Sequence, residues 1–296
     1  MPTIFVAENI NVMSKTIGPA MRNKDPKPIQ EYAVKLTENG ADYLDINLGP
    51  ARKGGPEMME FVVKSVQEVT DLPLYLDTMN VDAVERGLQV YEPRKGKAVI
   101  NSIMARPERM EALLPFVEKY ACEYVALLYG PEGLPRDENE RGELAANLHL
   151  EGTNRAYDES IMWFDPVVVP VCSQQQELQG CSAFMDMLPF MYPNAKSTCG
   201  LSNVSNGSPE HLRPILNQVY ISILRKKGIY SAILDGFDLE MMKLAKDERP
   251  DFDKIVHDTM DGVIDIGSLN KEELEIAKTV KLLMAQSLYS DSWLEL

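Results

Sequence analysis

The sequence has few cysteines and few histidines for its length. Its 296 residues include 4 cysteines and 3 histidines, and no two cysteines form a CxxC pair. Disulfide frameworks and structural zinc sites depend on suitably spaced cysteines, and zinc sites also use histidines. We therefore predict neither a disulfide framework nor a zinc site, and we expect no metal on this chain.

Long apolar runs and an excess of basic residues are also missing. No stretch approaches the roughly 18 apolar residues of a membrane helix, and the start MPTIFVAENINVM has no basic, then apolar, signal-peptide pattern. The net charge is -15 and the isoelectric point is about 4.7, so an acidic surface would repel nucleic-acid phosphates and anionic lipids. We expect a cytoplasmic protein whose partners are small molecules and other proteins, with no membrane and no nucleic acid among them.

Short strand-like runs alternate with helical patterns along the chain. In the first unit, Asp25 is an N-cap followed by Pro26 at the first helical position, and Asn39-Gly40 ends the helix. The strand-like runs are residues 3–7, 43–48, 74–77, 98–102, 124–129, 162–170, 197–201 and 231–234. Helical patterns include residues 57–69, 81–90, 107–120, 139–150 and 273–288.

Eight such units are typical of a parallel sheet closed by helical crossovers. We predict the α/β class and a single-domain (β/α)₈ TIM barrel over residues 1–296, with an insertion or helical extension at residues 247–271. The alternative is an open doubly wound sheet. The first turn between strand and helix, residues 8–16, contains no glycine and therefore lacks the dinucleotide-binding fingerprint of such sheets.

Polar residues stand where the predicted strands end. They are Glu8, Asn11, Asp45, Asn47, Asp77, Asn101, Asp165, Ser202, Asn203 and Asp235. In a barrel, the carboxyl ends of all strands meet at one mouth, so these side chains are expected to converge there. The set consists of carboxylates, amides and a hydroxyl, which suit a ligand rich in hydrogen-bond donors.

The pyrimidine edge of a reduced pterin is such a ligand, because it carries N–H groups beside a carbonyl. We select Asp77, Asn101 and Asp165 as its partners. The other interpretation is that each of the three caps the helix after its strand, which Asp and Asn side chains do well.

Six of these strand-end segments resemble, in order, the pterin-binding methyltransferase family. The segments are AENIN (7–11), LDINLGP (44–50), LDTMN (76–80), INS (100–102), DPVVVP (165–170) and GLSNVS (200–205). Within that family the chain looks most similar to the methyltetrahydrofolate:corrinoid protein methyltransferases. Their members serve the acetyl-CoA pathway or the demethylation of aryl methyl ethers (O-demethylation) or betaines in anaerobes.

The resemblance implies roles for individual residues. It makes Asp77, Asn101 and Asp165 the ligands of the pterin ring and places Asn203 beside the methyl-bearing N5, as the catalytic side chain. The further folate-binding positions it implies are Asp45, Asn47, Gly200 and Ser202 as the pocket wall, with Glu8, Asn11, Asp235 and Arg213 around them. Arg213 would approach the pterin or the glutamate tail.

The resemblance also implies partners. Tetrahydrofolate or 5-methyltetrahydrofolate would be the substrate, and cobalamin, a corrinoid, would be bound by a separate protein. This chain has no D-x-H-x-x-G segment of the kind that binds cobalamin. A homodimer is implied as well, and the Met- and Phe-rich stretch 181–192 is a candidate part of its interface.

Two departures from the acetyl-CoA-pathway members suggest a separate branch. Ala7 and Asn9 stand where those members tend to have Gly and Arg, and the loop 206–213 looks longer. The alternatives are a dihydropteroate synthase-like enzyme, which would need a cation at the seventh strand end, a metal-assisted aldolase or hydrolase barrel, and a non-catalytic partner-binding barrel.

Overall fold

The computed structural model describes residues 3–295, in which eight parallel strands form one sheet in the order β7-β6-β5-β4-β3-β2-β1-β8. The strands are β1 (Ile4–Asn11), β2 (Tyr43–Gly49), β3 (Leu74–Thr78), β4 (Val99–Met104), β5 (Glu123–Leu127), β6 (Met162–Asp165), β7 (Lys196–Ser197) and β8 (Ser231–Leu234). Past the end of β7, Ile233 N donates to Cys199 O across 2.8 Å, and Gly200 forms a parallel bridge with Ile233. These contacts join the two ends of the sheet, and the predicted (β/α)₈ barrel is confirmed.

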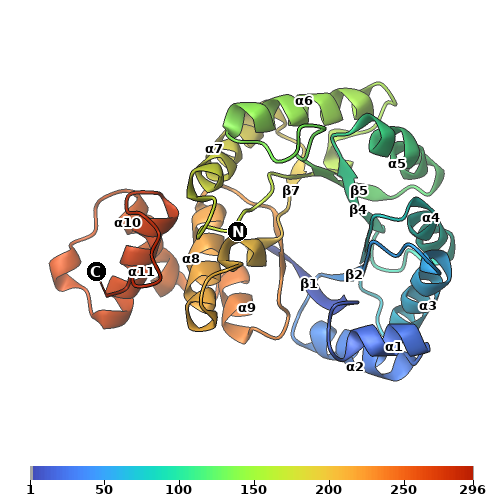
Figure 1. Ribbon diagram of the computed structural model, residues 1–296, viewed down its shortest axis with the longest axis horizontal. Coiled ribbons are helices and arrows are strands. Elements are labelled where there is room, and N and C mark those ends of the chain that lie inside the picture. The colour runs from blue at the N-terminus through green and yellow to red at the C-terminus, as the bar shows by residue number, and fades with distance from the viewer. Residues whose placement is uncertain (1–2, 296) are drawn as a thin grey trace.

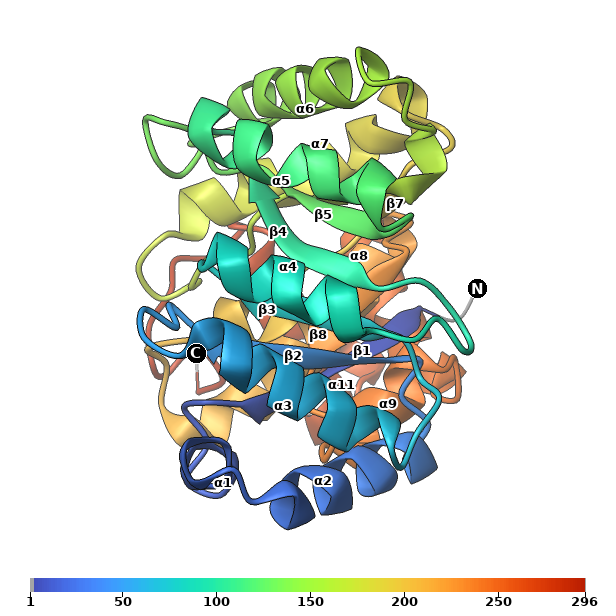
Figure 2. The same ribbon diagram turned by 90° about the vertical axis from the view of Figure 1, so that its right-hand side faces the viewer.

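Helices surround the barrel and connect successive strands, and the last three follow β8 (Figure 1). They are α1 (Ile17–Asn23), α2 (Pro26–Glu38), α3 (Gly55–Gln67), α4 (Val81–Val90), α5 (Pro107–Lys119), α6 (Glu138–Thr153), α7 (Gln175–Met191), α8 (Arg213–Lys226), α9 (Leu239–Ala245), α10 (Pro250–Met260) and α11 (Lys271–Leu283). Local sequence fixes several of their starts. The Asp25 carboxylate accepts from Lys27 N at the start of α2, and Asn80 accepts from Ala83 N at the start of α4. Figure 2 shows from the side how these helices flank the strands.

The structure corrects two predicted strands. The run 162–170 is a strand only as far as Asp165, because Pro166 has no N–H to continue the sheet. The run 197–201 contributes only the end of β7, and its continuation is a 3-10 helix, Leu201–Ser205. The sequence pattern also missed α1, which lies between β1 and the expected helix α2.

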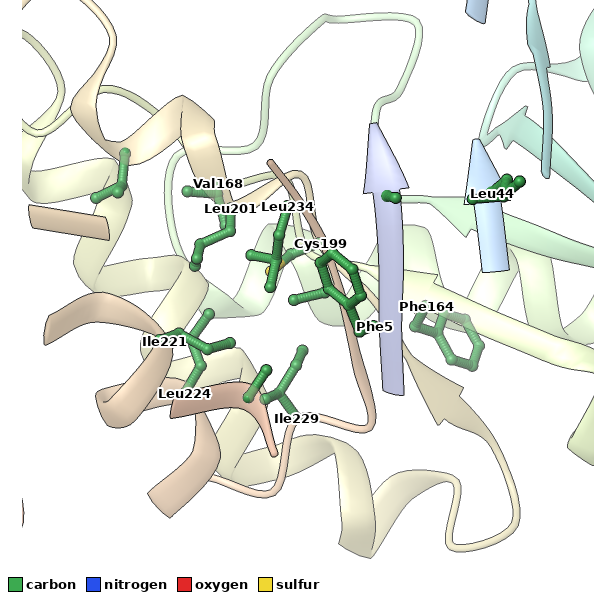
Figure 3. Packing of buried hydrophobic residues seen from close by; sticks show 14 of the residues in the cluster. Phe5, Leu44, Phe164, Val168, Cys199, Leu201, Ile221, Leu224, Ile229 and Leu234 are labelled. Atoms are coloured by element: carbon green, nitrogen blue, oxygen red, sulfur yellow. The ribbon is translucent and has the colours of Figure 1, made fainter. Parts of the chain in front are cut away.

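Two apolar layers hold the barrel. The outer layer lies between strands and helices, where side chains such as Phe5, Leu201 and Leu234 pack toward α8 (Figure 3). The inner layer is a separate cluster of Val6, Tyr75, Val99, Val125, Trp163 and Ile233. Side chains alternate between the two faces of a strand, so residues two positions further along face the same interior. Below the mouth, the barrel interior is therefore a packed apolar plug.

The segment 247–271 lies outside the helical ring. It comprises α10, a loop and the start of α11, and Figure 1 places both helices against the outer side of α8. Arg225 of α8 binds Asp253 of α10 at 2.6 Å, and Ser222 donates to the same carboxylate at 2.5 Å. The polar contacts fix this segment on α8.

None of the helices described in residues 3–295 combines the length and the apolar character that crossing a membrane requires.

Candidate functional site

Three side chains form a row across neighbouring strands at the barrel mouth. Asn47 pairs in register with Asp77 of β3, and Asp77 in turn pairs with Asn101 of β4. Asn47 Nδ2 donates to Asp77 Oδ2, and Asn101 Nδ2 donates to Asp45 Oδ1 at 3.1 Å. The predicted convergence of Asp45, Asn47, Asp77 and Asn101 is therefore present.

Burial makes the carboxyl groups of this row unusual acids. Desolvation by burial raises the pKa of Asp77 to about 7. Burial, together with repulsion from Asp77, raises the pKa of Asp45 well above its usual range, and only 2% of Asp45 is exposed. Both carboxyl groups are therefore protonated more readily than an ordinary aspartate, and a protonated carboxyl is a hydrogen-bond donor. The row can consequently donate as well as accept hydrogen bonds.

Asp165 faces the same mouth from the end of β6. It is 7% exposed, and burial raises the pKa of its carboxyl to about 7, although the charge of Arg141 acts in the opposite direction. Its Oδ1 accepts from Val167 N at 2.8 Å, and Val167 adopts the left-handed region with φ 61°. A β-branched residue rarely adopts that conformation, so the turn after β6 is specifically held.

The helix-capping interpretation of these three residues is wrong. The residue that caps α4 is Asn80, and the N-cap positions of α5 and α7 are Arg106 and Gln174, with no side-chain cap bond. Asp77, Asn101 and Asp165 thus do not serve as caps for the helices that follow their strands. Their polar atoms face the barrel mouth instead.

The opposite side of the mouth is formed by β1 and the 3-10 helix after β7. Ser202 Oγ donates to Glu8 Oε1 at 2.7 Å, and burial raises the pKa of Glu8. Asn203 is exposed, and its Oδ1 accepts from Asn206 Nδ2 at 3.1 Å. Gly200 leaves room for Asn203, because a Cβ there would lie 3.0 Å from Asn203 Nδ2.

Arg213 begins α8 and points back toward this 3-10 helix. Its Nε donates to Ser205 Oγ at 3.2 Å and its Nη2 to Asn206 Oδ1 at 3.4 Å. The positive charge of Arg213 also acts to lower the pKa of Glu8. The guanidinium is therefore beside the loop that carries Asn203, within electrostatic reach of the mouth.

Asn11 and Asp235 have local partners at the rim. Asn11 Oδ1 accepts from Met13 N at 2.8 Å. Asp235 Oδ1 accepts from Asn9 Nδ2 at 2.7 Å and from Phe237 N at 2.9 Å. Asn9 also accepts from Gly236 N at 2.7 Å, so this side chain ties the loop after β8 to β1. The departure at position 9 thus has a structural use here.

Sequence reasoning missed a buried arginine behind the mouth. Arg109 of α5 is 7% exposed, and it donates to Met79 O at 2.9 Å and to Ser102 O at 3.0 Å. Met79 follows the end of β3, which carries Asp77, and Ser102 follows Asn101 within β4, so Arg109 ties together the ends of these two strands. The sequence offered no signal for it, because arginines are usually exposed.

Within residues 3–295, no three His, Cys, Asp or Glu side chains are arranged so that they could hold a metal ion.

Comparison with known proteins points to pterin chemistry. Residues 8–234 match the pterin binding enzyme family. The chain is 25% identical over 241 residues to a methylcorrinoid:tetrahydrofolate methyltransferase of Eubacterium limosum, covering 81% of this chain and 87% of that protein. It is 26% identical over 259 residues to the methionine synthase of Mycobacterium tuberculosis (strain ATCC 25618 / H37Rv), covering 83% of this chain but only 21% of that longer protein.

Solved structures with a similar fold include dihydropteroate synthases. The enzyme of Xanthomonas albilineans in complex with 7,8-dihydropteroate superposes with a TM-score of 0.60 at 14% identity, covering 84% of this chain and 93% of that one. The enzyme of Thermus thermophilus gives a TM-score of 0.58 at 16% identity, with 83% and 93% covered. At these identities the likeness establishes the shared barrel fold.

Proposed function

The chain belongs to the pterin binding enzyme family, and we propose that it is a methyltransferase that moves a methyl group between N5 of tetrahydrofolate and the cobalt of a corrinoid held by a separate protein. The observation that carries this proposal is the convergence of Asp77, Asn101 and Asp165 at one mouth. The similarity to a methylcorrinoid:tetrahydrofolate methyltransferase over 81% of the chain supports the reaction.

The pterin ring would lie across the mouth, with its pyrimidine edge toward β3, β4 and β6. Asp77 and Asp165 would accept hydrogen bonds from the ring N–H groups as carboxylates, while the amide of Asn101 can both donate and accept. Asp45, Asn47, Gly200 and Ser202 would complete the wall. Glu8, Asn11 and Asp235 would line the β1 and β8 side, and Arg213 would stand near the pterin or the glutamate tail.

Asn203 would act at N5. A tertiary amine is a poor leaving group, so transfer requires the negative charge that develops at N5 to be stabilised as the N5–methyl bond breaks. The Co(I) corrinoid, a substrate delivered by its own protein, would be the nucleophile: cobalt would bond to the methyl carbon, and N5 would leave with the electron pair of the broken bond. Asn203 Oδ1 already binds Asn206, which leaves its Nδ2 as the group that would donate to N5. The amide transfers no net proton, so solvent would provide the proton that N5 acquires.

The remaining features of the proposal concern the cellular setting. We infer a place in the one-carbon metabolism of an anaerobe, in the acetyl-CoA pathway or in the demethylation of methyl ethers or betaines. We also infer a homodimer. A dihydropteroate synthase reaction is less well supported, because residues 197–205 at the end of β7 contain no lysine or arginine to hold its substrate anion.

The test is an anaerobic reaction of the purified protein with 5-methyltetrahydrofolate and cob(I)alamin. We expect the Co(I) absorbance to disappear at a rate proportional to enzyme. The proposal is wrong if no methyl transfer occurs while a pterin diphosphate and p-aminobenzoate are converted to dihydropteroate.

A further inference from the structure

Arg141 of α6 carries a buried charge. It is 0% exposed, and burial lowers the pKa of its guanidinium. Burying a charge in this way is destabilising unless its donors find partners. Its contacts show what this side chain does.

All three hydrogen bonds of Arg141 end on backbone carbonyl oxygens. Nε donates to Pro166 O at 2.8 Å, Nη1 to Asp137 O at 3.0 Å, and Nη2 to Glu177 O at 3.1 Å. These carbonyls belong to the turn after β6, the N-cap of α6 and the first turn of α7. Only the rigid fork of arginine can reach three such segments together.

The space around the guanidinium is also specific. A Cβ at Gly180 would lie 2.7 Å from Arg141 Nη1 and 2.7 Å from Asp137 Cα. Such contacts are closer than real Cβ atoms show, so a glycine is required where α7 passes over the arginine. The site is thus closed around this side chain.

The turn that Arg141 holds is the one that presents Asp165. Pro166 directly follows Asp165, and the backbone N–H of Val167, whose φ is 61°, donates to Asp165 Oδ1. The charge of Arg141 also acts on Asp165, where it opposes the effect of burial on the carboxyl. Arg141 therefore acts on Asp165, a proposed pterin ligand, in two ways: it holds the turn that follows Asp165, and its charge acts on the carboxyl.

We propose that Arg141 is a positioning residue of the pterin site, which fixes Asp165 in place and keeps it available as a carboxylate. The inference rests on the function proposed above. Arg141 touches no substrate, and its effect passes entirely through the Asp165–Val167 turn.

The test measures the dissociation constant of 5-methyltetrahydrofolate across about pH 5.5 to 8.5, a window around the Asp165 pKa. In Arg141→Met, we expect binding roughly 10-fold weaker at neutral pH and a pH midpoint about one unit higher, because the neighbouring positive charge is gone. Arg141→Lys keeps the charge but cannot bind all three carbonyls. It should bind more weakly than wild type with an almost unchanged midpoint.

Arg225→Met is the matched control, because the side chain of Arg225 is only 7% exposed but lies on α8, where it binds Asp253 and Asp247. It should lose stability and keep the wild-type midpoint. The inference is overturned if Arg141→Met binds 5-methyltetrahydrofolate with wild-type affinity and a wild-type pH midpoint. If Arg141→Met does not fold, the same result for Arg141→Lys overturns it. An equal midpoint shift in Arg225→Met would also overturn it. Absence of binding by the wild-type protein would instead overturn the proposed function on which it rests.

Discussion

Asn206 Nδ2 donates a hydrogen bond to Asn203 Oδ1 across 3.1 Å. Because Asn203 Oδ1 accepts this hydrogen bond, the Nδ2 group of Asn203 is available to donate to a ligand in the barrel mouth. Asn206 is itself held, since its Oδ1 accepts from Arg213 Nη2 at 3.4 Å. The proposed catalytic amide is therefore oriented by a second amide that sequence reasoning did not select.

This relationship predicts the effect of removing Asn206. In Asn206→Ala, the Asn203 amide can rotate, so turnover at saturating methyltetrahydrofolate should fall by roughly 3- to 10-fold, as for loss of one orienting hydrogen bond. Folate affinity should change less. Asn154→Ala removes an exposed asparagine at the C-cap of α6 and should retain wild-type turnover. Equal rates for all three proteins would remove the orienting role.

The proposed pterin ligands predict metal-independent binding. Asp165→Ala should weaken methyltetrahydrofolate binding by about 2 kcal/mol or more, because a buried charged hydrogen bond loses one partner. Calorimetry with and without a chelator measures the effect. Asp25→Ala, which removes only the N-cap of α2, should leave affinity unchanged. Binding that disappears on chelation, or that survives in Asp165→Ala, would contradict this assignment.

The raised pKa of Asp77 predicts how stability depends on pH. Since its pKa is about 7 in the folded protein and about 3.9 in an unfolded chain, the folded state binds the proton more tightly. Its contribution to stability is present below about pH 4 and is lost as pH rises through about 7. Asp77→Asn keeps an oxygen that can accept from Asn47 and should therefore stabilise the protein more at about pH 8 than at about pH 5. Thermal unfolding of wild type and Asp77→Asn at both pH values checks this prediction. A larger gain in stability at the lower pH would contradict it.

The expected homodimer predicts a mass of twice 33.2 kDa by light scattering at micromolar concentration. The stretch 181–192 ends α7, where Phe184 and Leu188 are buried but Phe190 is 89% exposed. Phe190→Asp should weaken a dimer that uses this surface and leave the fold intact. A monomer mass for the wild-type protein would remove the prediction, while a stable dimer of Phe190→Asp would place the interface elsewhere.

Much of the mouth was predictable because strand alternation is simple physics. Tyr43, Asp45 and Asn47 alternate along β2, so the side chains facing the interior change from aromatic to polar toward the carboxyl end. Parallel pairing then places the ends of neighbouring strands side by side. The positions of Asp77 and Asn101 follow from this pattern.

The turns and the buried supports were not predictable in the same way. The run 162–170 includes aromatic and β-branched residues that favour a strand, but Pro166 ends the strand early, and Val167 adopts the left-handed region. Arg109 and Arg141 look like ordinary helix-surface residues, since nothing in a helical pattern indicates that backbone carbonyls from other segments of the chain will surround them. Their roles depend on long-range packing.

The most direct test of the central claim is single-turnover methyl transfer from 5-methyltetrahydrofolate to cob(I)alamin, followed by stopped-flow spectroscopy for wild type and Asn203→Ala. Folate affinity is measured in parallel. If the amide stabilises the charge at N5, the rate at saturating folate should fall by roughly 10- to 1,000-fold, while affinity falls less. Wild-type turnover at saturation in Asn203→Ala would contradict the account.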